Sequence, residues 1–117
     1  MTNPLNNPFF LIPVVSGLIF ILAGYVMLKF PPKNINSIYG YRTNSSMKNK
    51  ERWDFAQTYS AMESIKLGAL LSLIGILGLW YHPATAVAMF MGITLLALTV
   101  LALLLRVENA IKRKFEK

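Results

Sequence analysis

The residues whose types could do chemistry gather between positions 31 and 60, where the chain reads PPKNINSIYGYRTNSSMKNKERWDFAQTYS. Arg42 carries a guanidinium, which can hold a carboxylate or a lipid phosphate through two parallel hydrogen bonds. In the alternative interpretation, Arg42 binds carbonyl groups at a helix end, or the carboxylate of Glu51 or Asp54. Arg42 therefore predicts either a loop that binds an anion or a loop that is held to the rest of the fold.

The chain lacks the residues that several other kinds of functional site require. The chain has no cysteine, which excludes disulfides, thiolate metal sites and thiol catalysis. His82 is the single histidine, so no zinc-hydrolase motif exists, and no glycine-rich phosphate loop is present. We expect no metal, no cofactor and no catalytic residue, and we predict that the protein is not an enzyme. His82 is expected in a solvated turn.

The composition indicates one integral membrane domain. Of the 117 residues, 55% are hydrophobic and 15% are charged, against about 25% charged in an ordinary soluble domain. Residues 1–28 and 67–105 contain no Asp, Glu, Lys or Arg. A soluble domain of this size has too little interior to bury two such stretches.

Three membrane-spanning helices are predicted, because about 20 residues at 1.5 Å each cross the hydrocarbon layer. They cover about 9–30, 62–81 and 84–105. The break at His82-Pro83 separates the last two, since proline stops one helix and suits the start of the next. The second helix must begin near Ala61, which places Glu63 and Lys66 as a pair at headgroup level.

Residues 31–62 are predicted to form a cytoplasmic loop and an amphipathic, interfacial helix that starts at about Ser46, with Ser45 or Ser46 as its N-cap. At 100° per residue the helix has two stripes. One contains Asn49, Trp53, Ala56 and Ser60, and the other contains Phe55, Tyr59 and Met62. We expect one stripe to contact the base of the bundle and the other to contact the lipid interface or a partner. The fold class is thus all-α, with three membrane helices and one loop helix.

The aromatic residues of the loop have a simple interpretation. Trp53, Tyr39 and Tyr41 are of the types that anchor proteins at the headgroup level. A specific ligand contact of Trp53 is the alternative.

The basic residues predict the orientation. Seven of the twelve lie in or beside the loop, and five lie in the tail, residues 106–117. Because positive charge marks the cytoplasmic side, we expect the N-terminus outside and the loop and tail in the cytoplasm. We expect the tail to contact anionic lipid, not nucleic acid. Docking of a cytoplasmic regulator on the tail is the alternative.

The membrane segments carry no ionisable residue at mid-bilayer depth, which disfavours a proton-coupled transporter. Small residues do recur there, at Gly17 and Gly24 in the first helix and at Gly68, Ser72 and Gly75 in the second. Small residues let membrane helices approach closely. Packing between the helices of one chain is the preferred interpretation, and contact in a homo-oligomer is the alternative.

One combination in the loop is specific to a family. It consists of Asn36, Gly40, Tyr41, Arg42, Thr43, Ser46, Asn49, Glu51, Trp53 and Ala56, with a membrane helix on either side. In these residues the chain, over roughly positions 20 to 105, resembles the SdpI-type immunity protein family of bacterial membrane proteins. It corresponds to the C-terminal membrane module of the longer members. The resemblance implies that the residues from Asn36 to Trp53 in this set bind a ligand or partner.

The resemblance also implies a location and a role. It implies a protein of the bacterial cytoplasmic membrane that gives immunity to a secreted antimicrobial peptide toxin. It further implies a signalling role, in which the protein senses the toxin and holds a cytoplasmic regulator at the membrane. A lipid-binding module and an oligomeric channel or small transporter are the alternative functions.

Overall fold

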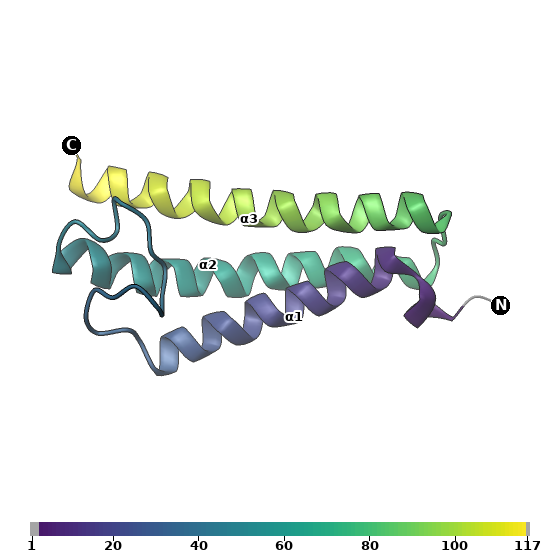
Figure 1. Ribbon diagram of the computed structural model, residues 1–117, viewed down its shortest axis with the longest axis horizontal. Helices are drawn as coiled ribbons and strands as arrows, with labels where there is room; N and C mark the ends of the chain where they lie inside the picture. The colour runs from purple at the N-terminus through teal and green to yellow at the C-terminus, as the bar shows by residue number, and fades with distance from the viewer. Residues whose placement is uncertain (1–2, 117) are drawn as a thin grey trace.

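The computed structural model describes residues 3–116, which contain helices and no strand (Figure 1). The elements are, in order, η1 (Pro4–Asn6), α1 (Pro8–Lys29), α2 (Lys50–Ile76), η2 (Leu77–Leu79) and α3 (Thr85–Phe115). The molecule measures 54 × 27 × 20 Å, and α2 runs between α1 and α3. All three long helices are long and apolar enough to cross a membrane. The predicted all-α fold of a multi-pass membrane protein is therefore confirmed.

Asn7 fastens the end of the bundle that lies away from the loop. Its side chain accepts a hydrogen bond from the amide of Phe9 at 3.1 Å, which caps α1. Its Nδ2 donates to the carbonyls of Gly78 and Tyr81, both at 3.0 Å. Asn7 is buried, so each of these bonds satisfies a polar group that water does not reach. One side chain thus links the start of α1 to the turn after α2.

The loop helix is not a separate element, and in this the prediction was wrong. The helix begins at Lys50 and continues to Ile76, so the loop helix and the second membrane span are one helix. Ser46 lies in the preceding turn, and Asn49 is the N-cap, accepting from the amide of Arg52 at 2.9 Å. No proline occurs between residues 50 and 76, so no residue removes a backbone donor and stops the helix.

The predicted basic tail is helical for most of its length. α3 continues ten residues past Leu105 to Phe115. Val107, Ala110 and Ile111 are buried, so packing stabilises this extension. Three of its four basic residues, Lys112, Arg113 and Lys114, lie in the last turn, where cations interact favourably with the helix dipole.

Small residues bring α1 and α2 into close contact, as the preferred interpretation predicted. A Cβ atom on Gly17 would lie 2.5 Å from the carbonyl oxygen of Gly68 and 2.8 Å from the amide nitrogen of Ser72. A Cβ on Gly75 would lie 2.8 Å from Pro13. Gly17 faces α2 and Gly75 faces α1, so the seam is already occupied within one chain.

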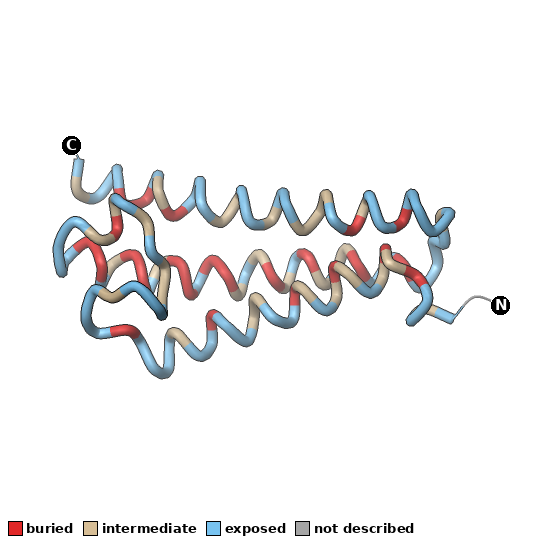
Figure 2. Tube along the Cα trace, viewed as in Figure 1, coloured by how far each residue is buried: buried red, intermediate tan, exposed pale blue. Residues whose placement is uncertain are grey.

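Buried residues concentrate on α2, above all near the loop, whereas α1 and α3 are largely exposed along their middles (Figure 2). A buried cluster lies at the loop end and consists of Ala56, Val107 and Ile111. The side chains packed against it are Tyr41, Phe55, Tyr59, Leu103 and Phe115. Two members of the second predicted stripe, Phe55 and Tyr59, therefore pack against α3, whereas Met62 is exposed. The cluster joins the loop, α2 and α3 into one unit.

We predict that Gly17→Val destabilises the protein by about 1–3 kcal/mol, because the backbone atoms of α2 cannot move aside for the added side chain. The free energy of unfolding, measured by denaturing-detergent titration in mixed micelles, checks this. Ala23→Val is the matched control, since Ala23 lies on the exposed side of α1. An equal effect of the two variants would contradict close packing at Gly17.

Candidate functional site

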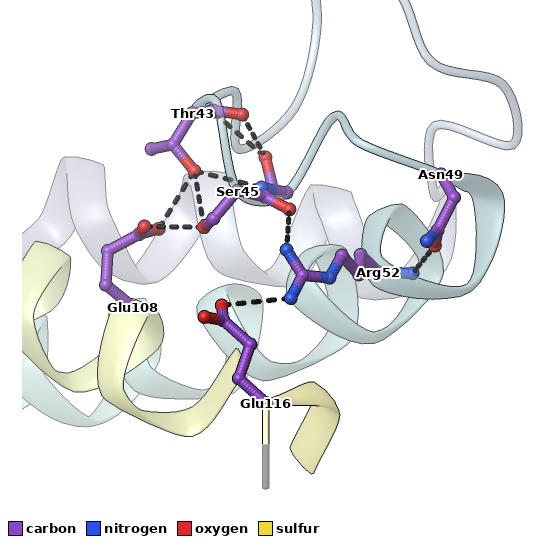
Figure 3. Close-up of polar contacts among 7 residues, drawn as sticks. Thr43, Ser45, Asn49, Arg52, Glu108 and Glu116 are labelled. Carbon is purple, nitrogen blue, oxygen red and sulfur yellow. Dashed lines mark hydrogen bonds and ion pairs between the residues drawn. The ribbon is translucent and has the colours of Figure 1, made fainter. Parts of the chain in front are cut away.

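The carboxylate of Glu108 on α3 is where the loop, residues 30–49, meets the helices (Figure 3). Three hydroxyls donate to it. Ser45 donates to Oε1 at 2.5 Å, while Tyr41 and Thr43 donate to Oε2 at 2.6 and 2.8 Å. Three hydrogen-bond donors stabilise the ionised form of this carboxylate. Glu108 therefore gathers three loop residues on one side chain.

Tyr41 is held at both its ends. Burial raises the pKa of its phenol well above the ordinary value of 10.0, and the hydrogen bond and charge of Glu108 raise it further, against a smaller opposite effect of Thr43. Its backbone is clamped by the side chain of Gln57, which accepts from the Tyr41 amide at 2.6 Å and donates to the Tyr41 carbonyl at 2.7 Å. The phenol stays protonated, as a donor to Glu108 must be.

Gly40 makes this clamp geometrically feasible. Its φ of 111° lies in the region that side-chain-bearing residues rarely adopt. A Cβ at this position would lie 2.5 Å from Oε1 of Gln57 and 2.8 Å from Pro32. The glycine between the two tyrosines is thus a point of close backbone approach.

Thr43 and Ser46 close the turn that precedes α2. The amide of Thr43 donates to Oγ of Ser46 at 2.9 Å, and the amide of Ser46 donates to Oγ1 of Thr43 at 3.2 Å. The Ser46 hydroxyl is buried and donates to the carbonyl of Thr43 at 3.0 Å, with the carbonyl of Tyr41 at 3.3 Å. This reciprocal pair explains why Ser46 does not cap the helix.

Arg52 provides a buried positive charge beside Glu108, and Figure 3 shows it between Ser45 and Glu116. The residue is 5% exposed. Its guanidinium donates to Glu116 at 3.0 Å and to the carbonyl of Ser45 at 3.4 Å, and it lies 5.5 Å from the ring centre of Phe115. Because a buried charge without a partner is costly, these contacts fix the end of α3 against α2.

Trp53 is too deeply buried to contact lipid headgroups as predicted, and both it and Tyr39 bind backbone carbonyls. Trp53 has no exposed surface, and its indole donates to the carbonyl of Pro32 at 2.7 Å. The Tyr39 hydroxyl donates to the carbonyl of Phe30 at 2.6 Å. Both carbonyls belong to the segment that follows α1, so these residues fasten the loop to the chain leaving α1.

The remaining motif residues serve local structure or lie at the surface. Asn36 accepts from the amides of Ile38 and Tyr39 at 2.9 and 2.7 Å, which shapes a turn. Asn49 is the N-cap described above. Glu51 is exposed in the first turn of α2, where a carboxylate suits the helix dipole.

Arg42 lies outside the network. Its guanidinium is exposed and donates to the carbonyl of Ser37, so the tie is to a loop carbonyl. Neither alternative carboxylate, Glu51 or Asp54, is the partner of Arg42 in the structure, and Asp54 instead pairs with Lys50 at 2.8 Å. The structure thus brings Tyr41, Thr43 and Ser46 of the predicted site together and leaves Arg42 at the surface.

Sequence reasoning missed Glu108, Arg52 and Gln57. One signal was present, because Glu108 is the only acidic residue between Glu63 and Glu116 and it stands in a strongly basic segment. Glu63 was expected in surface charge pairing with Lys66. That pair exists at 3.5 Å, but the Glu63 side chain is 4% exposed and also binds Arg106 of α3.

We predict that Glu108→Gln loosens the loop, because an amide offers one oxygen to three hydroxyl donors. Cleavage by trypsin after the exposed Arg42 should accelerate about tenfold, as expected for the loss of one charged hydrogen bond of about 1.4 kcal/mol. Mass spectrometry of the fragments measures the rate. Glu51→Gln, which removes an exposed carboxylate, should leave the rate unchanged; equal rates in all three proteins would show that Glu108 does not hold the loop.

We predict that the phenol of Tyr41 ionises only at strongly alkaline pH, as a late component of the titration, and that Tyr41→Phe removes this late component. The fold favours the protonated phenol, so this stabilisation is complete below pH 10.0 and is lost as the pH rises toward the folded pKa. Phenolate absorbance, recorded against pH in detergent, checks the prediction. Glu108→Gln should shift the late component to lower pH, and a late component that persists in Tyr41→Phe would refute the assignment.

Comparison with known proteins identifies the family to which the chain is similar. The family model described as the SdpI/YfhL protein family matches residues 33–107, which include the loop motif and Glu63 but not Glu108 or Glu116. The uncharacterized protein YfhL of Bacillus subtilis (strain 168) is 44% identical over 64 residues, which are 55% of this chain and 58% of that protein. The chain thus spans a little over half the length of this relative.

The search of solved structures gave no match. The family match agrees with the loop motif, whose residues from Asn36 to Trp53 lie inside the matched range. The chain belongs to the SdpI/YfhL protein family.

Proposed function

We propose that this protein is a non-enzymatic factor of the bacterial cytoplasmic membrane that gives tolerance to a secreted, membrane-active peptide toxin. The family match over residues 33–107 supports the proposal, together with the resemblance of the loop motif to SdpI-type immunity proteins. The three apolar helices agree with action within a membrane. The proposed orientation places the N-terminus outside and the loop and α3 end in the cytoplasm, following the basic residues.

The observation that carries the proposal is the contrast between Arg42 and its two neighbours. Tyr41 and Thr43 both donate to Glu108, whereas the guanidinium between them is exposed. A side chain displayed by an anchored backbone loses little entropy on binding, which favours recognition. A guanidinium is suited to a carboxylate, so we propose that Arg42 binds an acidic group of the peptide or of a cytoplasmic regulator.

The seam of small residues gives no support to an oligomeric channel. Gly17, Gly68 and Gly75 face contacts between α1 and α2 of one chain. We therefore propose tolerance, and not transport, as the function.

The test is a killing assay in a sensitive bacterium that expresses the wild type, Arg42→Ala, Lys48→Ala or an empty vector. We expect the wild type and Lys48→Ala to protect, and Arg42→Ala to fall to the level of the empty vector. Lys48 is an exposed base of the same loop, so its variant controls for the loss of one charge. Blots of membrane fractions establish equal amounts of protein.

Two outcomes would contradict the proposal in different ways. If cells with and without the wild-type protein die equally, the tolerance function is wrong. If Arg42→Ala protects as well as the wild type, the function stands and the role of Arg42 is wrong.

A further inference from the structure

Two hollows that differ in chemistry lie between α2 and α3, and we call the two together the groove. The apolar part has a volume of about 230 Å³ and presents hydrocarbon from both helices. Its lining includes Leu67, Leu70, Ile74, Leu95, Leu98 and Ala102. The polar part has a volume of about 210 Å³ and is lined by Tyr59, Arg106, Asn109 and Arg113.

The two parts follow one another along the same pair of helices. On α3, Ala102 of the apolar part and Arg106 of the polar part are one turn apart. On α2, Leu67 lies one turn beyond Glu63, and Glu63 is paired with Arg106 across the groove. The ion pair therefore marks the level at which the groove changes from apolar to polar.

This change coincides with the edge of the uncharged membrane segment. Residues 67–105 contain no Asp, Glu, Lys or Arg, and the polar part begins directly outside these bounds. The apolar part thus lies at the depth of lipid chains, and the polar part lies at the depth of headgroups. The groove is therefore apolar and then polar along its length, in the same order as the acyl chains and the headgroup of a phospholipid.

The charge at the polar part is positive and is incompletely paired. Arg106, Arg113 and Lys66 stand against the single carboxylate of Glu63. The side chain of Arg113 makes no hydrogen bond or ion pair with any other residue from 3 to 116, and it lines the cleft together with Tyr59. A guanidinium beside a phenol and an amide offers several donors to a phosphate.

We propose that this groove binds one anionic phospholipid from the leaflet on the loop side of the membrane. Its phosphate lies against Arg113 and Arg106, with Tyr59 and Asn109 as further donors. One acyl chain lies along Leu67, Leu70 and Leu98. The apolar part distinguishes a lipid from a free phosphate, because a soluble anion would leave that surface unfilled. This site is independent of the function proposed for Arg42.

The test compares the binding of phosphatidylglycerol and phosphatidylcholine, supplied in equal amounts in detergent micelles, to the purified full chain. Native mass spectrometry would measure retained phosphatidylglycerol in the wild type, Arg113→Gln and Lys112→Gln. We expect Arg113→Gln to lower the preference for phosphatidylglycerol about fivefold, the factor for one basic side chain near an anionic surface. Lys112→Gln makes the same charge change in the same turn but outside the cleft, and it should leave the preference unchanged.

A second variant tests the apolar part. Leu98→Trp fills the groove and should lower retention of the lipid at least as much as Arg113→Gln, while the circular dichroism of both variants matches the wild type. Added glycerol phosphate should not displace the lipid. The proposal is overturned if Arg113→Gln and Lys112→Gln act equally, if phosphatidylcholine is retained as well as phosphatidylglycerol, or if glycerol phosphate competes.

Discussion

The arrangement of the loop depends on one carboxylate, that of Glu108. A segment of twenty residues without regular structure loses much conformational entropy when it is ordered, and hydrophobic contacts of the loop alone are few. Three hydroxyl donors on one acceptor offset part of that loss. The acceptor is in place only because α3 extends past the membrane segment, and that extension is stabilised in turn by Val107 and Ile111. Loop order and helix length are therefore parts of the same interaction.

The fold class could be predicted from the sequence because it depends only on where the apolar segments begin and end along the chain. Two long uncharged segments and the break at His82-Pro83 determine three apolar helices without knowledge of any contact. The site was less predictable, because its partners are distant in sequence. Thr43 and Glu108 are 65 residues apart, and no local periodicity relates them. Trp53 was misplaced for a similar reason, since the statistical preference for headgroups ignores a carbonyl offered by Pro32.

Arg42 and Arg52 show that residue type alone does not determine whether an arginine is buried in the fold or exposed at its surface. Both lie in the basic loop region, and both could bind a carboxylate. Arg52 meets Glu116 and Phe115 and becomes buried, so its charge is used within the fold. Arg42 is displayed between two anchored neighbours and keeps its charge at the surface. The difference comes from the position of α3, which reaches one arginine and not the other.

The continuity of α2 has a mechanical consequence. A helix of 27 residues at 1.5 Å per residue is about 40 Å long, and no proline interrupts it. Its first turns hold the loop through Arg52 and Trp53, and the turn after its last residues is held by Asn7. α2 is thus a stiff rod that is held at each of its two ends by hydrogen bonds to other segments. Because the helix is continuous, a rotation of α2 about its own axis would move the contacts at both ends together.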